Sequence, residues 1–443
     1  MNKAKTLLGL VGLLSLSSAA WARIETVTGP SFDLIADAGY INSPDGTPVL
    51  IWGYGNINGS SLAQYPGPTM EVNQGDAVTV TLSNNLNYPV SLVFPGQTGV
   101  SCSGGTTVTR AIAQCEAAPG EAVIYTFTAG QPGTYMYYSG TRPDIQVEMG
   151  LVGSMVVRPA GYALGTNASH PNRRAYSHAD SQYDHEHLFV LTEMDLRVHE
   201  AIEFGGYDTV DTSDYHASLW FINGRNGPDT LNPDDPAGTD FPYQPYGSLV
   251  LTRPNDKVLL RVAGAGKELH PFHTHGNHFT QIARDGRMLS TGALAGADLA
   301  FQNFTLQSMP GGTYDALWSW TGAGLGWDMY GYNATDNPTF CGANNQPLPG
   351  YPATTQDVSD RCKPVPVTLP ENQAQAAGPF YSGGPFLGTA GNLPPGQGGL
   401  NPWGGYFYMW HSHTERELVN NDLFPGGMLT MAVVVPPNTT IGD

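Results

Sequence analysis

Short runs in which hydrophobic and polar residues alternate recur along most of the chain. The run 77–82 reads Ala-Val-Thr-Val-Thr-Leu and has the period of two that is typical of a β-strand, and the turn formers Gln74-Gly75-Asp76 precede it. Further strands, separated by Gly and Pro, are predicted at 91–94, 122–127, 133–138 and 153–157. These short, closely spaced strands predict a first β-sandwich that ends near residue 159.

A polar segment without periodicity follows this sandwich. Residues 160–187 carry no hydrophobic pattern, so we interpret them as a linker between two domains. Strand patterns return in the second half of the chain, at 188–191, 220–222, 249–252, 257–262, 278–283, 406–410 and 428–435. We therefore expect domains at 23–159 and 188–443, the second with a Gly-, Pro- and Asn-rich loop insertion at 322–405.

The first 22 residues have the three-part pattern of a secretory signal peptide. Lys3 and Lys5 precede an apolar run at 7–16, and the mostly small residues that follow end in Ala22, after which we expect cleavage. The apolar run is shorter than the roughly 20 residues that a membrane-spanning helix needs, and no other stretch is long enough. The sequence thus predicts an exported protein, periplasmic, extracellular or at the cell surface, with no integral membrane segment.

Composition supports an all-β protein and narrows the choice of partners. The chain contains 55 Gly and 35 Pro, and 13% of its residues are charged, against about 25% in an average protein. Such a composition excludes a helical bundle, and the 40% of hydrophobic residues exclude a disordered chain. The net charge of −19 would repel phosphate backbones, so we expect no nucleic-acid partner.

The four cysteines fall into two local pairs, Cys102 with Cys115 and Cys341 with Cys362. An even number of cysteines in an exported chain favours disulfides over free thiols, because the compartment is oxidising. We predict that each local pair forms a disulfide, so that each domain contains one. The chain has no Cys-x-x-Cys motif that would indicate a redox or zinc-ribbon role.

Six of the twelve histidines lie in two short stretches of the second domain. The first stretch contains His270, His273, His275 and His278, and the second contains His411 and His413. Alternate residues of a strand point to the same face, so His273 with His275 and His411 with His413 would form two pairs that converge from two strands. Imidazoles in this arrangement suit copper, zinc, iron or nickel. The alternative is a set of solvent-facing histidines without a metal.

Several motifs resemble those of the cupredoxin-type multicopper oxidase superfamily and occur in the family's order. They are 66–76 (Pro-Gly-Pro-Thr-Met-Glu-Val-Asn-Gln-Gly-Asp), 131–135 (Gln-Pro-Gly-Thr-Tyr), 221–225 (Phe-Ile-Asn-Gly-Arg), 270–276 (His-Pro-Phe-His-Thr-His-Gly) and the segment 411–428. Together they extend over nearly all of the predicted mature chain. The resemblance implies cupredoxin-like Greek-key β-sandwiches and copper as the cofactor.

The chain departs from this family at positions that would hold copper. The resemblance implies a type 1 copper bound by two histidines, a cysteine and often a methionine. The corresponding positions here are His270, approximately Glu417, Ser412 and Met428. Because a blue copper site depends on a copper–thiolate bond, Ser412 predicts that no type 1 copper is bound.

The resemblance also implies a trinuclear copper cluster held by eight histidines, four from the first domain and four from the last. His273, His275, His411 and His413 match the last-domain half, but no histidine occurs between residues 1 and 169. Four imidazoles do not provide the ligands for three copper ions. We therefore predict one copper ion per chain, with zinc as the alternative, bound by these four residues, and His270 as a further candidate ligand.

Two functions fit these observations. The first is an exported copper-binding protein with a mononuclear, type 2-like histidine site and at most limited oxidoreductase activity. The second is a catalytically inactive structural or surface-assembly protein on the same scaffold, for which the missing ligands and the long insertion argue. Laccase-type turnover would require ligands that the chain lacks. A homo-oligomer or a surface assembly is compatible with both functions.

Overall fold

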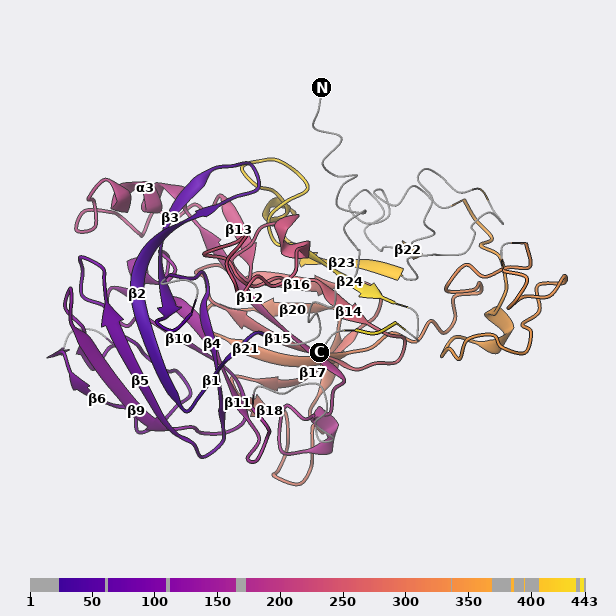
Figure 1. The fold of residues 1–443 in the computed structure, drawn as a ribbon, viewed down its shortest axis with the longest axis horizontal. Coiled ribbons are helices and arrows are strands. Elements are labelled where there is room, and N and C mark those ends of the chain that lie inside the picture. Colours follow the sequence, from indigo (N-terminus) through magenta and orange to yellow (C-terminus); the bar gives the residue numbers. More distant parts are fainter. Residues whose placement is uncertain are drawn as a thin grey trace.

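The computed structural model describes residues 24–59, 63–108, 112–164, 173–335, 337–368, 384–385, 394, 406–435 and 439–441. These residues form two β-sandwiches, the first in indigo to purple and the second in magenta to yellow (Figure 1). The prediction of an all-β chain with two cupredoxin-like sandwiches and two disulfides is confirmed. The predicted signal peptide lies outside the described residues, as does much of the predicted insertion.

The first sandwich consists of a four-stranded and a five-stranded sheet. The four-stranded sheet has the order β1 (Val27–Thr28), β4 (Gly67–Asn73), β11 (Val152–Arg158) and β10 (Gly133–Tyr138). The five-stranded sheet has the order β3 (Pro48–Asn56), β2 (Ser31–Asn42), β5 (Ala77–Asn84), β9 (Ala122–Thr128) and β6 (Ser101–Gly104). A small third sheet pairs β7 (Thr106–Thr107) with β8 (Cys115–Glu116).

The second sandwich consists of a seven-stranded and a six-stranded sheet. The seven-stranded sheet has the order β13 (Leu219–Ile222), β12 (His185–Met194), β15 (Val258–Gly264), β21 (Thr313–Trp318), β17 (Phe279–Arg284) and β18 (Arg287–Met288), with β19 (Phe301–Asn303) paired to β17. The six-stranded sheet has the order β14 (Val250–Thr252), β24 (Leu429–Val434), β23 (Tyr406–Ser412), β16 (His270–Thr274) and β20 (Thr305–Ser308), with β22 (Gly384–Pro385) paired to β23.

The described helices are short and lie between strands. They are α2 (Pro143–Gln146), α3 (Leu196–Glu203) and the 3₁₀ turns η1 (Ala179–Ser181), η2 (Asp229–Leu231), η3 (Val358–Asp360) and η4 (Glu415–Leu418). Asp195 caps α3, because its side chain accepts a hydrogen bond from the backbone N–H of Arg197. None of the helices in the described part of the chain has the length and apolar character needed to cross a membrane.

Both predicted disulfides are present. Cys102 is bonded to Cys115 in the first domain, and Cys341 to Cys362 in the loops between β21 and β22. These loops, drawn in orange, project from the side of the second sandwich that lies away from the first (Figure 1). The described part of this region contains little regular secondary structure. The Cys341–Cys362 disulfide stabilises it by reducing the conformational entropy of the unfolded chain.

The predicted strand at 91–94 does not form. In this segment only Val93 makes an isolated bridge, to Tyr138, and the neighbouring Val90 makes one to Ala117. Pro89 and Pro95 flank the segment and lack the N–H groups that a regular ladder needs, which accounts for the interruption. Leu92 and Phe94 are nevertheless buried in the first core, and Val93 is half-buried.

The two sandwiches meet through an apolar layer. Val152 and Val156 of β11 and Met136 of β10 belong to the same buried cluster as Leu188 and Val190 of β12. These side chains come from one sheet of each sandwich, so their burial requires that both domains are present.

A network of buried ion pairs crosses the same interface. Arg158 of β11 contacts Glu71 of β4 at 2.7 Å and Glu186 of β12 at 2.5 Å. Arg261 of β15 contacts the same Glu186 at 2.9 Å and Asp315 of β21 at 3.5 Å. All five side chains are nearly inaccessible to solvent. Two guanidinium groups and three carboxylates therefore compensate one another across the domain boundary.

Glu186 is the central residue of this network of ion pairs. Burial alone would raise the pKa of its carboxyl, but the guanidinium groups of Arg158 and Arg261 lower that pKa to about 2. Glu186 is therefore ionised at neutral pH. Because a buried charge without its partner is costly, removal of either arginine should destabilise both domains together.

We expect Arg261→Ala to lower the free energy of unfolding by about 3–5 kcal/mol, because it leaves Glu186 and Asp315 as buried charges with fewer partners. Urea unfolding followed by far-UV circular dichroism measures the effect. Arg284→Ala is the control, since Arg284 forms an exposed pair with Asp285 and its loss should cost less than about 1 kcal/mol. Equal losses in the two variants would contradict this account.

Candidate metal centre

The register between β16 and β23 brings the two histidine stretches together. The strands are antiparallel, with His273 opposite His411 and Phe272 opposite Ser412. Along β16 the residues alternate between buried and half-buried positions, so Phe272 packs in the core while His273 lies on the other face. The predicted convergence of the two stretches therefore follows from strand alternation together with this pairing.

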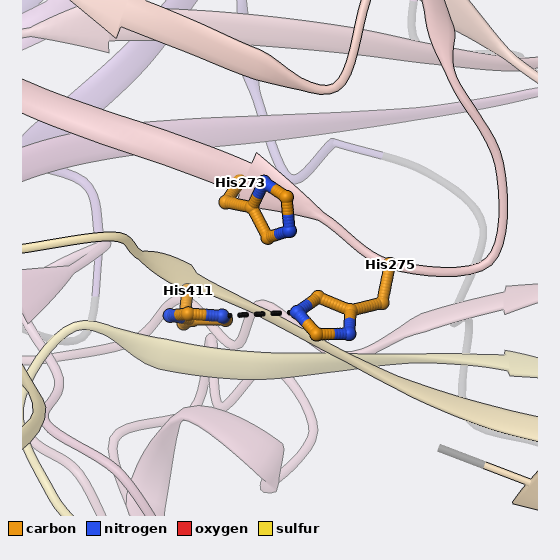
Figure 2. Close-up of side chains that lie close together, drawn as sticks. All are labelled: His273, His275 and His411. Carbon is orange, nitrogen blue, oxygen red and sulfur yellow. Dashed lines mark hydrogen bonds between the residues drawn. The ribbon is translucent and has the colours of Figure 1, made fainter. Parts of the chain in front are cut away.

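Three histidines form a compact group on this face. One ring nitrogen from each of His273, His275 and His411 lies within 4.8 Å of those of the other two. Nε2 of His275 and Nε2 of His411 are 3.1 Å apart, and the ring of His273 lies above both (Figure 2). Two nitrogens that each lie about 2.0–2.1 Å from a shared ion have a similar separation. The separation of these two nitrogens is therefore compatible with a shared metal ion.

His413 lies beside this group but outside it. Its ring centroid is 4.9 Å from that of His273 and 5.5 Å from that of His411. The side chain is 51% exposed, and its Nδ1 is 3.0 Å from Oε1 of Glu415. His413 is thus at the solvent-facing edge of the group, where a rotation of its side chain would change its distance to the other rings.

Hydrogen bonds orient two of the three rings. Nδ1 of His411 lies 2.6 Å from the carbonyl oxygen of Ser412, which can only accept, so Nδ1 carries the proton and Nε2 is unprotonated. Nδ1 of His273 lies 2.8 Å from Oγ1 of Thr305 on the neighbouring β20. Contacts of this kind behind a ligand hold its other nitrogen toward the metal.

The contact between His275 and His411 also follows from this tautomer. Because Nε2 of His411 is unprotonated, Nε2 of His275 donates the hydrogen bond between them. The two Nε2 atoms thus face each other across one shared proton.

The environment keeps these imidazoles neutral. Burial, followed by the proximity of the other histidines, lowers the pKa of His275 to about 3. Burial likewise lowers the pKa of His411 to about 4 and that of His273 by a smaller amount. Neutral imidazole is the form that binds metal ions.

His270 does not join the three histidines. It is fully buried, with Nδ1 2.9 Å from Oε2 of Glu417 and Nε2 2.7 Å from Oε2 of Glu193. Burial disfavours the imidazolium form, but hydrogen bonds to both carboxylates outweigh burial and raise the pKa of His270 to about 9. His270 is therefore a cation at neutral pH with both ring nitrogens donating.

Backbone hydrogen bonds join the other positions that the resemblance assigns to type 1 copper, Glu417, Ser412 and Met428. The backbone N–H of Ser412 donates to the carbonyl of Met428, and the N–H of Met428 donates to the carbonyl of Glu417. Met428 is fully buried in the core of the second domain. Backbone hydrogen bonds thus connect Ser412, Met428 and Glu417, and Met428 packs in the core.

The segments 91–93 and 138–140, where the resemblance implies the first-domain histidines, contribute to a polar cluster. Oγ of Ser91 accepts from the N–H of Gly140 at 3.0 Å and lies 2.9 Å from Oγ1 of Thr141. Oγ of Ser139 donates to Oε1 of Gln146 at 2.6 Å. These side chains are buried, and their polar groups are paired with one another.

Two residues that matter here were missed by the sequence analysis. Thr305 lies in a short strand that the hydrophobic pattern did not predict, and it orients His273. Glu193 lies near the end of β12, where an acidic residue interrupts an apolar run. A buried acid needs a partner, so this interruption was the signal for Glu193, although it did not identify His270 as that partner.

We expect His270 to make stability dependent on pH. Its pKa of about 9 in the folded chain exceeds the value of about 6.5 in an unfolded chain. Its contribution is therefore fully present below pH 6.5 and is lost as the pH rises through about 9. Urea unfolding from pH 6 to pH 10 should show that the advantage of the unchanged chain over His270→Gln shrinks across this range. A constant difference would contradict the assignment.

Part of the first domain resembles a known protein family. Residues 54–161 match the family model described as multicopper oxidase. The chain is 40% identical over 121 residues to the iron transport multicopper oxidase fetC of Epichloe festucae, which covers 26% of this chain and 17% of that protein. It is 40% identical over 106 residues to the L-ascorbate oxidase of Cucurbita pepo var. melopepo, which covers 23% of this chain and 18% of that enzyme. The matched segments therefore span less than a fifth of these relatives.

Solved structures agree on the fold over a longer stretch. The blue copper oxidase from Nitrosomonas europaea aligns with a TM-score of 0.53 and 18% identity over 91% of this chain and 85% of that one. The multicopper oxidase mgLAC aligns with a TM-score of 0.53 and 17% identity over 93% of this chain and 88% of that one. Residues 54–161 thus match the multicopper oxidase family model, and over most of the chain the two sandwiches share the fold of solved multicopper oxidases.

Proposed function

We propose that the chain is an exported copper-binding protein with one mononuclear site, formed by His273, His275 and His411. The observation that supports this most strongly is the group of three imidazole nitrogens within 4.8 Å of one another. The two disulfides fit export, because such bonds persist in oxidising compartments. Copper bound there would supply one-electron redox chemistry.

The donor set fits copper, and its surroundings leave room for a further ligand. Imidazole suits copper, zinc, iron and nickel, and the family favours copper among them. Thr305 and the Ser412 carbonyl hold two of the rings through their Nδ1 atoms. His413 is half exposed at the edge of the site, so it is available as a fourth donor or leaves that position to water or a small molecule.

We propose that oxidoreductase activity is at most limited. Ser412 stands where the resemblance expects a thiolate, and His270 has both nitrogens bonded to carboxylates rather than directed at an ion. The segments 91–93 and 138–140, where the resemblance expects first-domain histidines, contain none, and Ser91 and Ser139 there bond to Thr141 and Gln146. One site of three histidines would move single electrons, whereas reduction of dioxygen to water requires four.

Copper titration tests the site. We expect the unchanged chain to bind one copper ion and to lack an intense blue absorption, because no thiolate ligand is present. His275→Ala and His411→Ala should each abolish stoichiometric binding, since each removes one of three donors. His216→Ala is the control, because His216 is exposed and pairs with Asp214 away from the site. Equal binding by all four proteins would show that copper is held elsewhere.

Oxygen consumption tests the activity. With a phenolic or small one-electron reductant, the copper-loaded chain should turn over well below the roughly 1–1,000 per second that is typical of enzymes. The residual rate should disappear in His411→Ala. Rates in the ordinary enzymatic range would contradict the proposal of limited activity. No difference between the two proteins would favour the structural role instead.

A further inference from the structure

We propose that Glu193, His270 and Glu417 form a buried ionic crosslink that positions the histidine strands β16 and β23 for metal binding. The three residues are called the Glu–His–Glu triad below. This inference rests on the copper site proposed above, but it concerns residues that do not contact that site. It assigns a positioning role to a buried cationic histidine that the proposed function does not use.

The triad joins three separate elements of the second domain. His270 is the first residue of β16, Glu193 lies in β12 of the opposite sheet, and Glu417 lies in η4. The two contacts are 2.7 Å and 2.9 Å long, and all three side chains are almost completely buried. Charge-assisted hydrogen bonds of this length in a dry interior are strong and directional.

The charges around the triad explain why it holds its shape. Both ring nitrogens of His270 must donate, because each faces a carboxylate oxygen. Glu193 also accepts hydrogen bonds from the backbone N–H groups of Lys267 and Glu268. The two carboxylates bind opposite ring nitrogens, so they do not converge on one point. The triad is therefore a linear bridge rather than a metal site.

The bridge is connected to the metal histidines through short paths. On β16, His270 precedes His273 by three residues. On the other side, the carbonyl of Glu417 accepts from Met428, whose carbonyl accepts from Ser412, the residue between His411 and His413. The N–H of His413 in turn donates to the carbonyl of Pro271, next to His270. A closed loop of contacts thus joins the ends of both histidine strands.

This loop lies on the inner side of the sheet, and the histidines lie on the other face. His270 and Phe272 are fully buried, whereas His273 and His275 are half-buried. The triad can therefore hold the two strands in register without occupying space that the metal or a small ligand needs. Loss of one carboxylate would release η4 and the end of β23 and would widen the distances between histidine nitrogens.

The test compares variants of Glu417 in the full-length chain. Glu417→Ala removes the bridge, whereas Glu417→Gln keeps an oxygen that accepts from Nδ1 of His270. His185→Gln is the matched control, because His185 is also buried and bonded to a carboxylate, Asp256, but contacts neither histidine strand. For each protein we measure the copper dissociation constant by chelator competition, the copper hyperfine splitting by electron paramagnetic resonance, and thermal unfolding.

We expect Glu417→Ala to weaken copper binding roughly tenfold, the lower end of the effect of residues behind metal ligands, and to change the hyperfine splitting. Glu417→Gln should restore both values, and His185→Gln should lower stability without changing the splitting. If Glu417→Ala does not fold, Glu417→Asp replaces it, because it withdraws the carboxylate by one methylene and should change the splitting in the same way.

Three results overturn the inference, and they can be distinguished from one another. If the unchanged chain binds copper and Glu417→Ala (or Glu417→Asp) has the same affinity and splitting, the triad does not position the site, while the proposed function stands. If the unchanged chain does not bind copper at all, the proposed function fails and the inference fails with it. A change in splitting that His185→Gln reproduces would assign the effect to general loss of stability and would also overturn the positioning role.

Discussion

The antiparallel register of β16 and β23 is the constraint on which the site depends. A shift of β16 by one residue would move His273 to the core face, away from His411, and would move Phe272 out of the core. Burial of the apolar side chains therefore determines the register, and this register places His273 opposite His411. The site is precise because it lies on two paired strands rather than on loops, and only His275 extends beyond the strand end.

Contacts with the first domain also stabilise the second domain. Its other sheet packs on the first domain through apolar residues and through the buried pairs around Glu186. Glu193, in the same strand β12 as Glu186, contacts His270 on the sheet of the histidines. One strand thus carries two buried acids, one directed to the domain interface and one to the histidine sheet. Both acids are compensated by cations, as buried charges must be.

The chain shares the fold of solved multicopper oxidases, and its buried polar groups pair with one another. At Ser412 and His270 the contacts are hydrogen bonds and ion pairs, and at Ser91 and Ser139 they are side-chain hydrogen bonds within a buried cluster. Buried polar groups must be paired whether or not a metal is present. This requirement explains how the fold persists with residues other than metal ligands at these positions, and why His270 has strong contacts on both sides.

The sequence by itself determined the fold class and both disulfides, because strand alternation and cysteine spacing are local properties, and it indicated that the histidines of each stretch share a face. It did not predict β2, β3 or α3, and it placed a strand at 91–94 that the flanking prolines prevent. Only the tertiary structure decided that His273, His275 and His411 form one group with His413 at its edge, and that His270 lies between Glu193 and Glu417. Those contacts join residues 77 to 147 positions apart, and a local pattern carries no information about which distant strands become neighbours.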